Sequence, residues 1–287
     1  MDWQMLASRL FPLGHDITEH ESFLSGSAQV AQRNVTEENV SSALPLVGSA
    51  LPLVGGALPL VAAGNVTVGN ATPTPAPPLG ISTVAVIGTA NHASIGVEIA
   101  LAQAQAVLKT VREHPQRPIL ILVDTQGQRL RHRDELLGIN SYMAHLGKCI
   151  ELARRRNHPV IGLVYDQALS GGFITSGLMA DACYALPDAT IRVMGLPAMA
   201  RITKVPEEKL VELAKDNPVF APGAENYLRM GGIEAIWQGD LAAHLVIALE
   251  SVSRTDRRSA SGLARGGRKL AHNVADAVVA DSHVRAA

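Results

Sequence analysis

The sequence predicts an α/β fold with mostly parallel strands, and three observations support it. Short apolar runs, such as residues 119–123 and 160–164, have the composition of strands that are buried on both faces. Stretches of helical composition alternate with these runs along the chain. Hydrophobic residues make up 47% of the 287 residues but aromatic residues only 3%. We therefore expect an aliphatic, alanine-rich core in which helices and strands approach closely.

The first half of this fold begins at residue 81. The β-branched run 81–87 predicts a strand, and residues 94–113 predict a helix that ends before Pro115. The apolar stripe of this helix is Ile95, Ile99, Ala102, Ala106 and Val107. After the strand 119–123, a second helix is expected over residues 135–156, with Asp134 as its N-cap. Its last turn contains Arg154, Arg155 and Arg156, which suit the negative end of the helix dipole.

The second half continues the alternation of strands and helices after the strand 160–164. A glycine pair, Gly171-Gly172, leads into an expected helix over residues 173–180. Short strands are then expected at 182–185 and 190–194, and helical segments at about 207–215, 224–230 and 239–250. Repeated strand–helix–strand units of this kind are typical of a mostly parallel sheet.

The chain divides by composition into four parts. An N-terminal segment, residues 1–32, contains a strand at 22–32. Residues 33–80 contain near copies of one seven-residue string that start at Ala43, Ala50 and Ala57, each with a proline that breaks a helix. A solenoid is the alternative, but three such units bury little surface, so we expect a flexible insertion that ends in a polyproline-II linker. Residues 81–250 form the main domain.

The last part, residues 251–287, is rich in arginine, serine, alanine and glycine and has weak periodicity. We expect a disordered, solvated tail, with contact to a partner or to nucleic acid as the alternative. The formal net charge of −1 argues against a nucleic-acid-binding protein as a whole. Two cysteines without metal spacing, and no apolar leader or long apolar run, predict a cytoplasmic protein in a reducing compartment.

Two strand ends carry the candidates for chemistry. The strand 119–123 runs into Asp124-Thr125-Gln126-Gly127-Gln128, and the strand 160–164 leads to Ser170-Gly171-Gly172 at the start of a helix. Ligands gather at the carboxyl ends of parallel strands, and a glycine amide can approach a ligand closely. Free N–H groups at a helix start add further donors. Two such turns could stabilise one oxyanion; two ordinary turns between strand and helix are the alternative.

Side chains near these turns are weaker candidates. Ser170 lacks the first glycine of G-x-S-x-G and has no indicated histidine and acid partners, so we expect a turn residue or helix N-cap rather than a nucleophile. His92 could bind a substrate carboxylate, or cap or pack against a helix. Asp124 and Asp166 could be catalytic or could form local hydrogen bonds. No P-loop and no metal-ligand spacing among the ten histidines is visible, so we expect no metal site.

Several strings resemble the biotin-dependent acyl-CoA carboxyltransferases of the crotonase superfamily. Residues 123–127 resemble their Asp-Thr-Pro-Gly motif, with Gln126 in place of proline, and residues 170–173 resemble their Tyr-Gly-Gly-Ala turn. The strings 180–187 and 191–195 resemble the segment of those enzymes that comes after the turn. A closer resemblance is to the gamma subunit of biotin-independent malonate decarboxylase, over about 1–30 and 81–250. The strings that carry it are 96–104, 165–172, 197–201 and 220–232.

The resemblance implies a crotonase/ClpP-like superhelix of ββα units, of the carboxyltransferase type. It implies that a malonyl thioester on an acyl-carrier protein loses CO2 through an oxyanion-stabilised enolate and becomes an acetyl thioester. The implied partners are a related beta subunit that shares the active site, an alpha subunit that transfers acyl groups to the carrier, and the carrier (delta) subunit. A phosphoribosyl-dephospho-CoA arm would belong to the carrier, and no cofactor would be bound directly.

The resemblance also assigns residues to the site. The backbone N–H groups of Gly171 and Gly172 are expected to form one donor loop, and those of Gly127 and Gln128 the other. Residues expected to bind the substrate are Ser170, Gln126, His92 and Asp166. A carboxyltransferase acting on another acyl-CoA, and a non-catalytic scaffold that completes its partner's site, are the alternatives. Residues 31–80 depart from the family pattern, and we expect deletion of 35–79 to preserve activity because surface insertions cost little loop entropy.

Overall fold

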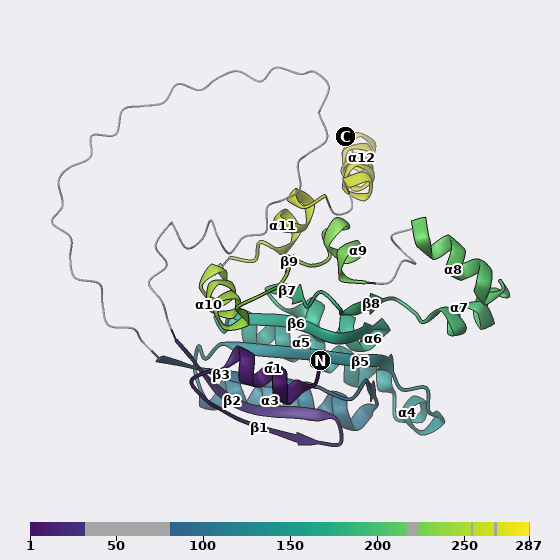
Figure 1. Cartoon of the computed structure of the whole chain (residues 1–287). Helices are drawn as coiled ribbons and strands as arrows, with labels where there is room; N and C mark the ends of the chain where they lie inside the picture. The colour runs from purple at the N-terminus through teal and green to yellow at the C-terminus, as the bar shows by residue number, and fades with distance from the viewer. Residues whose placement is uncertain (32–80, 217–222, 254, 267–268, 287) are drawn as a thin grey trace, which may run out of the picture.

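The computed structural model of the protein describes residues 1–31, 81–216, 223–253, 255–266 and 269–286. Figure 1 shows a twisted sheet with helices on both faces, as the alternating pattern predicts. The insertion expected at residues 33–80 lies outside the described residues. Among the described residues, no helix is long and apolar enough to cross a membrane.

One sheet contains the nine strands of the described chain, in the order β1-β2-β3-β5-β6-β7-β9. The first three strands pair in antiparallel fashion and the remaining pairs are parallel. Two short strands lie off this path, because β4 pairs with β5 and β8 pairs with β6. The strands are β1 (His15–His20), β2 (Phe23–Ala31), β3 (Ile81–Thr89), β4 (Ala93–Ile95), β5 (Ile119–Gln128), β6 (Val160–Leu169), β7 (Ala182–Ala185), β8 (Thr190–Arg192) and β9 (Ala235–Ile236).

The pairing of β2 with β3 fixes the two ends of the insertion. These strands are antiparallel neighbours, and Ala31 stands directly opposite Ile81. The chain therefore leaves and re-enters the sheet at adjacent positions. The segment between Ala31 and Ile81 therefore connects two neighbouring antiparallel strands.

Helices cover both faces of the sheet (Figure 1). The helices α1 (Trp3–Leu10) and α10 (Leu241–Ser251) share one apolar core with Leu120 and Leu122 of β5. The helices α3 (Val97–Glu113) and α5 (Ile139–Arg155) share the other core with Ile121 and Val123. Successive side chains of a strand point to opposite faces. The next two residues of β5 must therefore also diverge, Asp124 toward the α1 face and Thr125 toward the α5 face.

The helix expected at residues 135–156 is divided in two, and its predicted cap is wrong. Gly138 adopts a left-handed conformation, with φ 76°, between α4 (His132–Leu136) and α5. Asp134 lies inside α4, where its carboxylate accepts the N–H of Val97 at 3.3 Å, at the start of α3. Arg131 holds this carboxylate at 2.8 Å. Asp134 therefore serves a distant helix, which a local capping pattern cannot reveal.

Other elements differ from expectation mainly at their ends. The helix expected at 173–180 starts earlier, as α6 (Ser170–Ile174), and is followed by a short 3-10 helix, Gly177–Met179. The expected strand 190–194 ends at Arg192, because the helix α7 (Leu196–Thr203) begins soon afterwards with Pro197 in its first turn. The helices α8 (Glu207–Asp216) and α9 (Ala224–Arg229) lie close to their expected ranges.

The expectation of a disordered tail at 251–287 is wrong for the described residues. They include two helices, α11 (Arg258–Ala264) and α12 (Lys269–Ala286). Arg265, just after α11, donates to the carbonyl of Gly231 at 3.0 Å and forms an ion pair with Glu234. The contacts that hold this segment are formed with distant residues, so weak local periodicity could not predict them.

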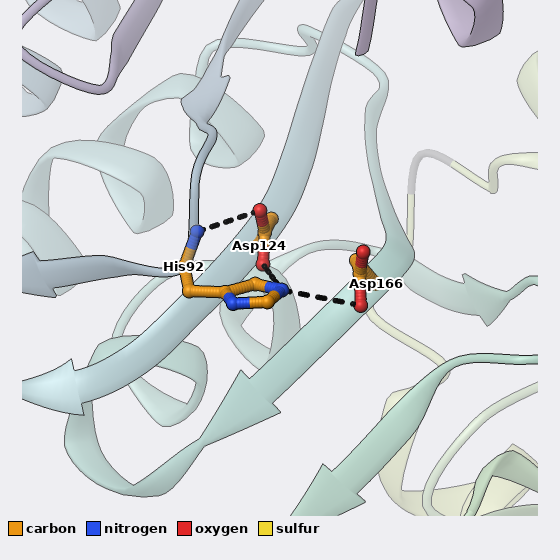
Figure 2. Close-up of side chains that lie close together, drawn as sticks. All are labelled: His92, Asp124 and Asp166. Carbon is orange, nitrogen blue, oxygen red and sulfur yellow. Dashed lines mark hydrogen bonds and ion pairs between the residues drawn. The ribbon is translucent and has the colours of Figure 1, made fainter. Parts of the chain in front are cut away.

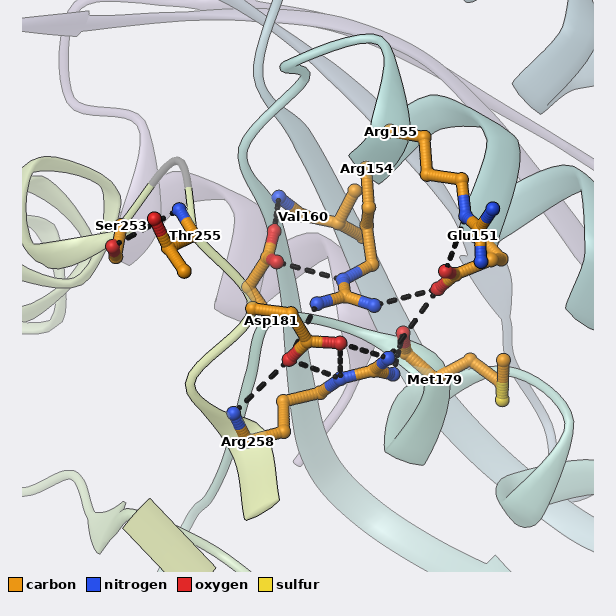
Figure 3. A network of polar contacts seen from close by, with 10 residues as sticks. Glu151, Arg154, Arg155, Val160, Met179, Asp181, Ser253, Thr255 and Arg258 are labelled. Carbon is orange, nitrogen blue, oxygen red and sulfur yellow. Dashed lines mark hydrogen bonds and ion pairs between the residues drawn. The ribbon is translucent and has the colours of Figure 1, made fainter. Parts of the chain in front are cut away.

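A network of arginines and acids fastens the start of this segment to the main domain (Figure 3). Its centre is Arg154, whose side chain is only 5% exposed and which donates to Asp181 at 2.7 Å and to Glu151 at 2.6 Å. Asp181 also accepts the N–H of Val160 at 2.9 Å. Arg258 reaches Asp256 at 2.7 Å and Glu151 at 3.3 Å. Arg154, expected merely to complement a helix dipole, thus joins α5, β7 and the C-terminal segment.

Candidate active site

The two glycine turns lie in direct contact at the carboxyl ends of β5 and β6. A Cβ atom added to Gly172 would lie 2.9 Å from Thr125 Oγ1 and 3.1 Å from the Cα atom of Gly127. A Cβ atom added to Gly127 would lie 2.9 Å from both the carbonyl oxygen of Leu169 and the Cβ atom of Ser170. Gly127 also has φ 93°, which other residues rarely adopt. The structure therefore brings together the two turns that the sequence singled out.

Gly171 has more room than its neighbour. A Cβ atom there would lie 3.1 Å from Cε of Met143, the end of a flexible side chain. The carbonyls of the pair are used inside the turn, because Gly171 accepts from the N–H of Thr175 at 3.0 Å and Gly172 from the hydroxyl of Ser176 at 2.6 Å. The N–H groups of both glycines belong to the first turn of α6, where a helix offers no internal acceptor.

Thr125 holds the Gly127 turn in place. Its hydroxyl donates to the carbonyl of Ala93 at 2.6 Å and accepts the N–H of Gly127 at 2.9 Å. The Gly127 N–H, expected to be an oxyanion donor, is therefore already engaged, and that assignment is wrong. A hydroxyl two residues earlier can satisfy a turn amide in this way.

Gln128 is the other predicted donor of this turn. The following residue, Arg129, donates its N–H to Ile95 of β4 at 2.8 Å. Because N–H groups alternate in direction along a strand, that of Gln128 points away from β4. The Gln128 side chain donates to Glu135 at 3.1 Å, and its Oε1 atom lies 3.9 Å from the position a Cβ would take on Gly171. Gln128 therefore borders both turns.

Ser170 is a turn residue, not a helix cap. It has φ 52°, and α6 begins at Ser170 itself, with Leu169 in the capping position and no side-chain capping bond. In the described part of the chain, no hydrogen bond links the Ser170 hydroxyl to a histidine. Gln126 is exposed at the tip of the neighbouring turn. Neither residue has the surroundings of an activated nucleophile.

The other side chains predicted at the site, His92 and Asp166, lie with Asp124 in a separate cluster (Figure 2). The Nε2 atom of His92 is 3.8 Å from Asp124 Oδ1 and 3.5 Å from Asp166 Oδ1. The His92 N–H donates to Asp124 Oδ2 at 2.8 Å. Asp124 leaves β5 on the face that carries α1, opposite to Thr125 and Gly172. The structure thus groups these three residues with one another rather than with the glycine pair.

Burial is the main influence on the pKa of Asp124. Its side chain is 4% exposed, and desolvation raises its pKa, against the opposing effects of the His92 N–H and the His92 ring. Asp166 is more open, and its Oδ2 atom lies 3.5 Å from the N-terminal amine of Met1. The neighbouring Tyr165 donates its hydroxyl to the carbonyl of Thr89 at 2.9 Å, and burial raises its pKa. Tyr165 is therefore a neutral, structural neighbour of the cluster.

Arg192 was not predicted as a functional residue. The pairing of β6 with β8 sets it beside Leu169, one residue before the turn that contains the glycine pair. Its Nε atom is buried without a hydrogen-bond partner, and no ion pair to its guanidinium occurs among the described residues. The available signal was an arginine inside the apolar run 191–194. A half-buried cation without a partner is a candidate for binding an anion.

Exposed apolar side chains occur close in sequence to both turns. Leu130 follows β5, Leu136 lies on α4, and Ile174 lies on α6; their exposed fractions are 88%, 74% and 49%. Apolar surface that flanks free backbone donors is typical of a site completed by another molecule.

Comparisons with known proteins identify the family of this chain. The family model of the malonate decarboxylase gamma subunit (MdcE) matches residues 90–282. A Pseudomonas malonate decarboxylase hetero-tetramer solved in complex with coenzyme A contains a chain that is 26% identical, with a TM-score of 0.61. That match covers 70% of this chain and 87% of the Pseudomonas chain. The Pseudomonas MdcD-MdcE hetero-dimer gives a similar match, at 25% identity and a TM-score of 0.59, over 70% of this chain and 86% of that chain.

Two further relatives extend the comparison. The Malonomonas rubra malonyl-S-ACP:biotin-protein carboxyltransferase MADD is 36% identical over 151 residues, which are 50% of this chain. The matched region spans about half the length of that relative, 52%. A transcarboxylase 12S core is 20% identical with a TM-score of 0.51, over 59% of this chain and 34% of that one. It shares the carboxyltransferase type of crotonase fold, so the predicted fold class is confirmed.

Proposed function

We propose that this chain, which belongs to the malonate decarboxylase gamma-subunit family, contributes half of an active site that decarboxylates a malonyl thioester. The contact between the Gly127 and Gly172 turns is the observation that carries the proposal. This contact supports a site in which N–H groups of both strand-end turns would face one small volume. The substrate would be a malonyl group on an acyl-carrier protein, and the products an acetyl thioester and CO2.

Backbone N–H groups would stabilise the negative charge that forms during the reaction. Breaking the bond to the departing CO2 leaves its electron pair on the acetyl fragment, as an enolate whose charge rests on the thioester oxygen. Addition of a proton from water to the α-carbon would then give the acetyl thioester. We assign the N–H groups of Gly171, Gly172 and Gln128 to this developing oxyanion. One preorganised donor of this kind lowers the barrier by roughly 3 kcal/mol. Gly127 would leave room for the substrate but would not donate a hydrogen bond to it, because its N–H donates to Thr125.

Side chains would then recognise the substrate. We assign Arg192 to the free carboxylate of the malonyl group, because it pairs with Leu169, one residue before the turn, and its Nε atom is buried without a partner in the described chain. A cation that binds this carboxylate stabilises the charged ground state, so Arg192 would favour binding rather than speed the loss of CO2. Ser170 and Gln126 would border the substrate, whereas His92 and Asp166 are not part of this arrangement.

A partner would complete the site. The exposed Leu130, Leu136 and Ile174 suit burial against a related beta subunit, and the solved Pseudomonas MdcD-MdcE structure is a hetero-dimer. Such an interface would exclude water and so disfavour the carboxylate relative to neutral CO2. An alpha subunit would load the carrier, and the carrier's phosphoribosyl-dephospho-CoA arm would bring the thioester to the site. No cofactor would be bound by this chain for the reaction.

A carboxyltransferase activity is the second candidate. The relative from Malonomonas rubra is described as a carboxyltransferase from malonyl-S-ACP to a biotin protein. The same enolate would form in both reactions. In the transfer reaction the carboxyl group would pass to biotin instead of leaving as free CO2.

Reconstitution with the beta subunit tests the proposal. We expect the purified beta–gamma pair to release CO2 from a malonyl-carrier thioester without biotin, and either subunit alone to release almost none. CO2 release that requires an added biotin protein would favour the carboxyltransferase. Full activity of the beta subunit alone would contradict a catalytic contribution from this chain.

A further inference from the structure

We propose that His92, Asp124 and Asp166 form a binding site for a divalent transition-metal ion, separate from the glycine turns. The three side chains come from three segments: the β3–β4 turn, β5 and β6. One nitrogen and two carboxylate oxygens lie within 4.8 Å of one another. Figure 2 shows the imidazole ring between the two acids. Because the ligands are far apart in sequence, no spacing motif indicates this site.

The distances suit ligands better than direct ion pairs. A charge-assisted hydrogen bond between a ring N–H and a carboxylate is about 2.7–2.9 Å long. The two gaps here are 3.5 Å and 3.8 Å. Two atoms that each lie about 2.1 Å from a metal ion at a tetrahedral angle are about 3.4 Å apart. The two gaps to His92 are therefore close to the spacing of metal ligands, and the two carboxylate oxygens, which lie within 4.8 Å of each other, would move together around the ion.

The charge of the buried acid is the second, independent argument. The Asp124 side chain is 4% exposed and points into the cluster, yet among the described residues the only basic nitrogen within 4 Å of its carboxylate is His92 Nε2, at 3.8 Å. Its other contacts are backbone N–H groups, from His92 at 2.8 Å and Gln167 at 3.3 Å. A buried carboxylate without a closely bound cation is costly. A divalent ion shared with Asp166 would offset this cost directly.

The backbone holds the histidine in an unfavourable conformation. Asn91 and His92 are consecutive non-glycine residues with φ 57° and 51°. The Asn91 side chain is tied to Glu19, which also accepts from Trp3 at 2.7 Å. The His92 N–H is tied to Asp124. Several contacts therefore maintain the strained backbone from which the His92 ring extends toward the two acids.

The donor set indicates the class of metal. An imidazole nitrogen with two carboxylates suits zinc, cobalt, manganese or ferrous iron better than magnesium or calcium, which prefer oxygen alone. The His92 side chain is 43% exposed and that of Asp166 is 34% exposed, so an ion can enter and water can fill its remaining positions. The ion would replace the contact of Asp166 with the Met1 amine. Its role would be to fasten the β3–β4 turn to the ends of β5 and β6.

Metal titration of the purified full-length chain tests this proposal. We expect isothermal titration with Zn²⁺ to give one more bound equivalent for the wild type than for His92→Gln or Asp166→Asn. If a variant still binds this equivalent, its affinity should be at least about tenfold lower than that of the wild type. The matched controls are His145→Gln and Asp188→Asn, which replace an exposed histidine and an exposed aspartate elsewhere. Both controls should retain the equivalent.

A second readout uses Co²⁺. Its d–d absorption should appear in the wild type and be lost in His92→Gln, and Zn²⁺ should raise the melting temperature of the wild type but not of the two cluster variants. Circular dichroism would confirm that the variants are folded. Equal stoichiometry and affinity in the wild type and both cluster variants would overturn the proposal. The three side chains would then be close neighbours that do not bind an ion.

Discussion

The two ends of the central strands use their polar groups in opposite ways. At the amino ends, Arg154 contacts Asp181 and Glu151, and Asp181 also holds the first N–H of β6, so each charge has a partner. At the carboxyl ends, the N–H groups of Gly171 and Gly172 have no acceptor within α6, and Arg192 has no partner in the described chain. The difference indicates that the amino ends serve stability, while the carboxyl ends offer donors to a ligand.

The two ends of the strands also differ in whether they use charged side chains or neutral backbone groups. Burial alone would lower the pKa of Arg154, but its hydrogen bond to Asp181 and the nearby acids raise it. The carboxyl ends use neutral backbone donors around Gly172 instead. A fully paired cluster has little affinity left for a ligand, whereas amides in the first turn of a helix can still donate to one. Substitutions at the amino ends should therefore change stability, and substitutions at the carboxyl ends should change activity.

The largest effect is expected on stability, from Arg154→Met. The change leaves Asp181 and Glu151 without their buried partner, and breaking such a pair typically costs about 3–5 kcal/mol. Arg155→Met is the matched control, because Arg155 is 77% exposed and exposed ion pairs contribute less than about 1 kcal/mol. Urea unfolding of the full-length chain measures both. Equal losses would show that burial of Arg154 does not decide its contribution.

A large effect on catalysis is expected from Gly172→Ala. The added methyl group meets Thr125, Ile95 and the backbone of Gly127, so both turns must shift and turnover should fall about 100-fold. In Gly171→Ala the methyl group meets the ends of the Met143 and Gln128 side chains, which can move, and turnover should fall only a few-fold. Malonyl-carrier decarboxylation by the beta–gamma complex gives the comparison. Similar losses in both variants would argue against the tight contact as the source of activity.

Thr125→Val should have an intermediate effect. The substitution keeps the shape of the side chain but leaves the Gly127 N–H and the Ala93 carbonyl without their partner, a cost of about 1–3 kcal/mol. Turnover should fall about tenfold as the turn loosens. Thr110→Val is the control, because that buried hydroxyl contacts only Ala106 of its own helix. If both variants reduced turnover equally, the effect would reflect general destabilisation.

Arg192→Gln should raise KM about tenfold, with a smaller change in kcat. One charge-assisted contact is worth about 1.5–3 kcal/mol, and we assign this contact to substrate binding. Arg192→Lys should restore part of the affinity through its charge, without the bidentate geometry. The exposed Arg112→Gln is the control at the far end of α3. An unchanged KM in Arg192→Gln would contradict the role assigned to Arg192.

The smallest predicted effect is a loss of stability at low pH. Hydrogen bonds from Arg155 and Arg258 lower the pKa of Glu151 and Asp256, respectively. Groups with a lowered folded pKa contribute stability above their unfolded values, 4.5 and 3.8, and lose it as the pH falls toward the folded values. The melting temperature should therefore decline below about pH 5, and less steeply in Arg258→Ala. A parallel decline in both proteins would exclude a contribution of Arg258 to this dependence.

Sequence patterns predicted the core of the fold because its strands are continuous apolar runs. The runs 119–123 and 160–164 form the buried parts of β5 and β6. The apolar stripe of residues 94–113 likewise became α3. Composition could not show that one glycine, Gly138, divides a helix. It also could not show that charges at Arg258 and Arg265 order a segment with weak periodicity.

The candidate site was predictable where glycine geometry decides it. The glycine pair and Gly127 could be identified from strand ends, and they do meet. The engagement of the Gly127 N–H could not be foreseen, because it depends on the rotamer of Thr125. His92 and Asp166 are separated from the turns because they lie close to Asp124, whose side chain lies on the α1 face of the sheet. A single residue of strand register decides that face.

The pairing of Ala31 with Ile81 has a practical consequence for engineering this chain. Opposed residues of an antiparallel pair have Cα atoms about 5 Å apart. A compact reporter protein with neighbouring termini could therefore be grafted there in place of residues 35–79 without straining the ladder. The same junction is a natural position for new chain ends in a circular permutant. A reporter at this junction would allow the proposed beta–gamma complex to be detected by fluorescence or captured by affinity, at a position far from the glycine turns.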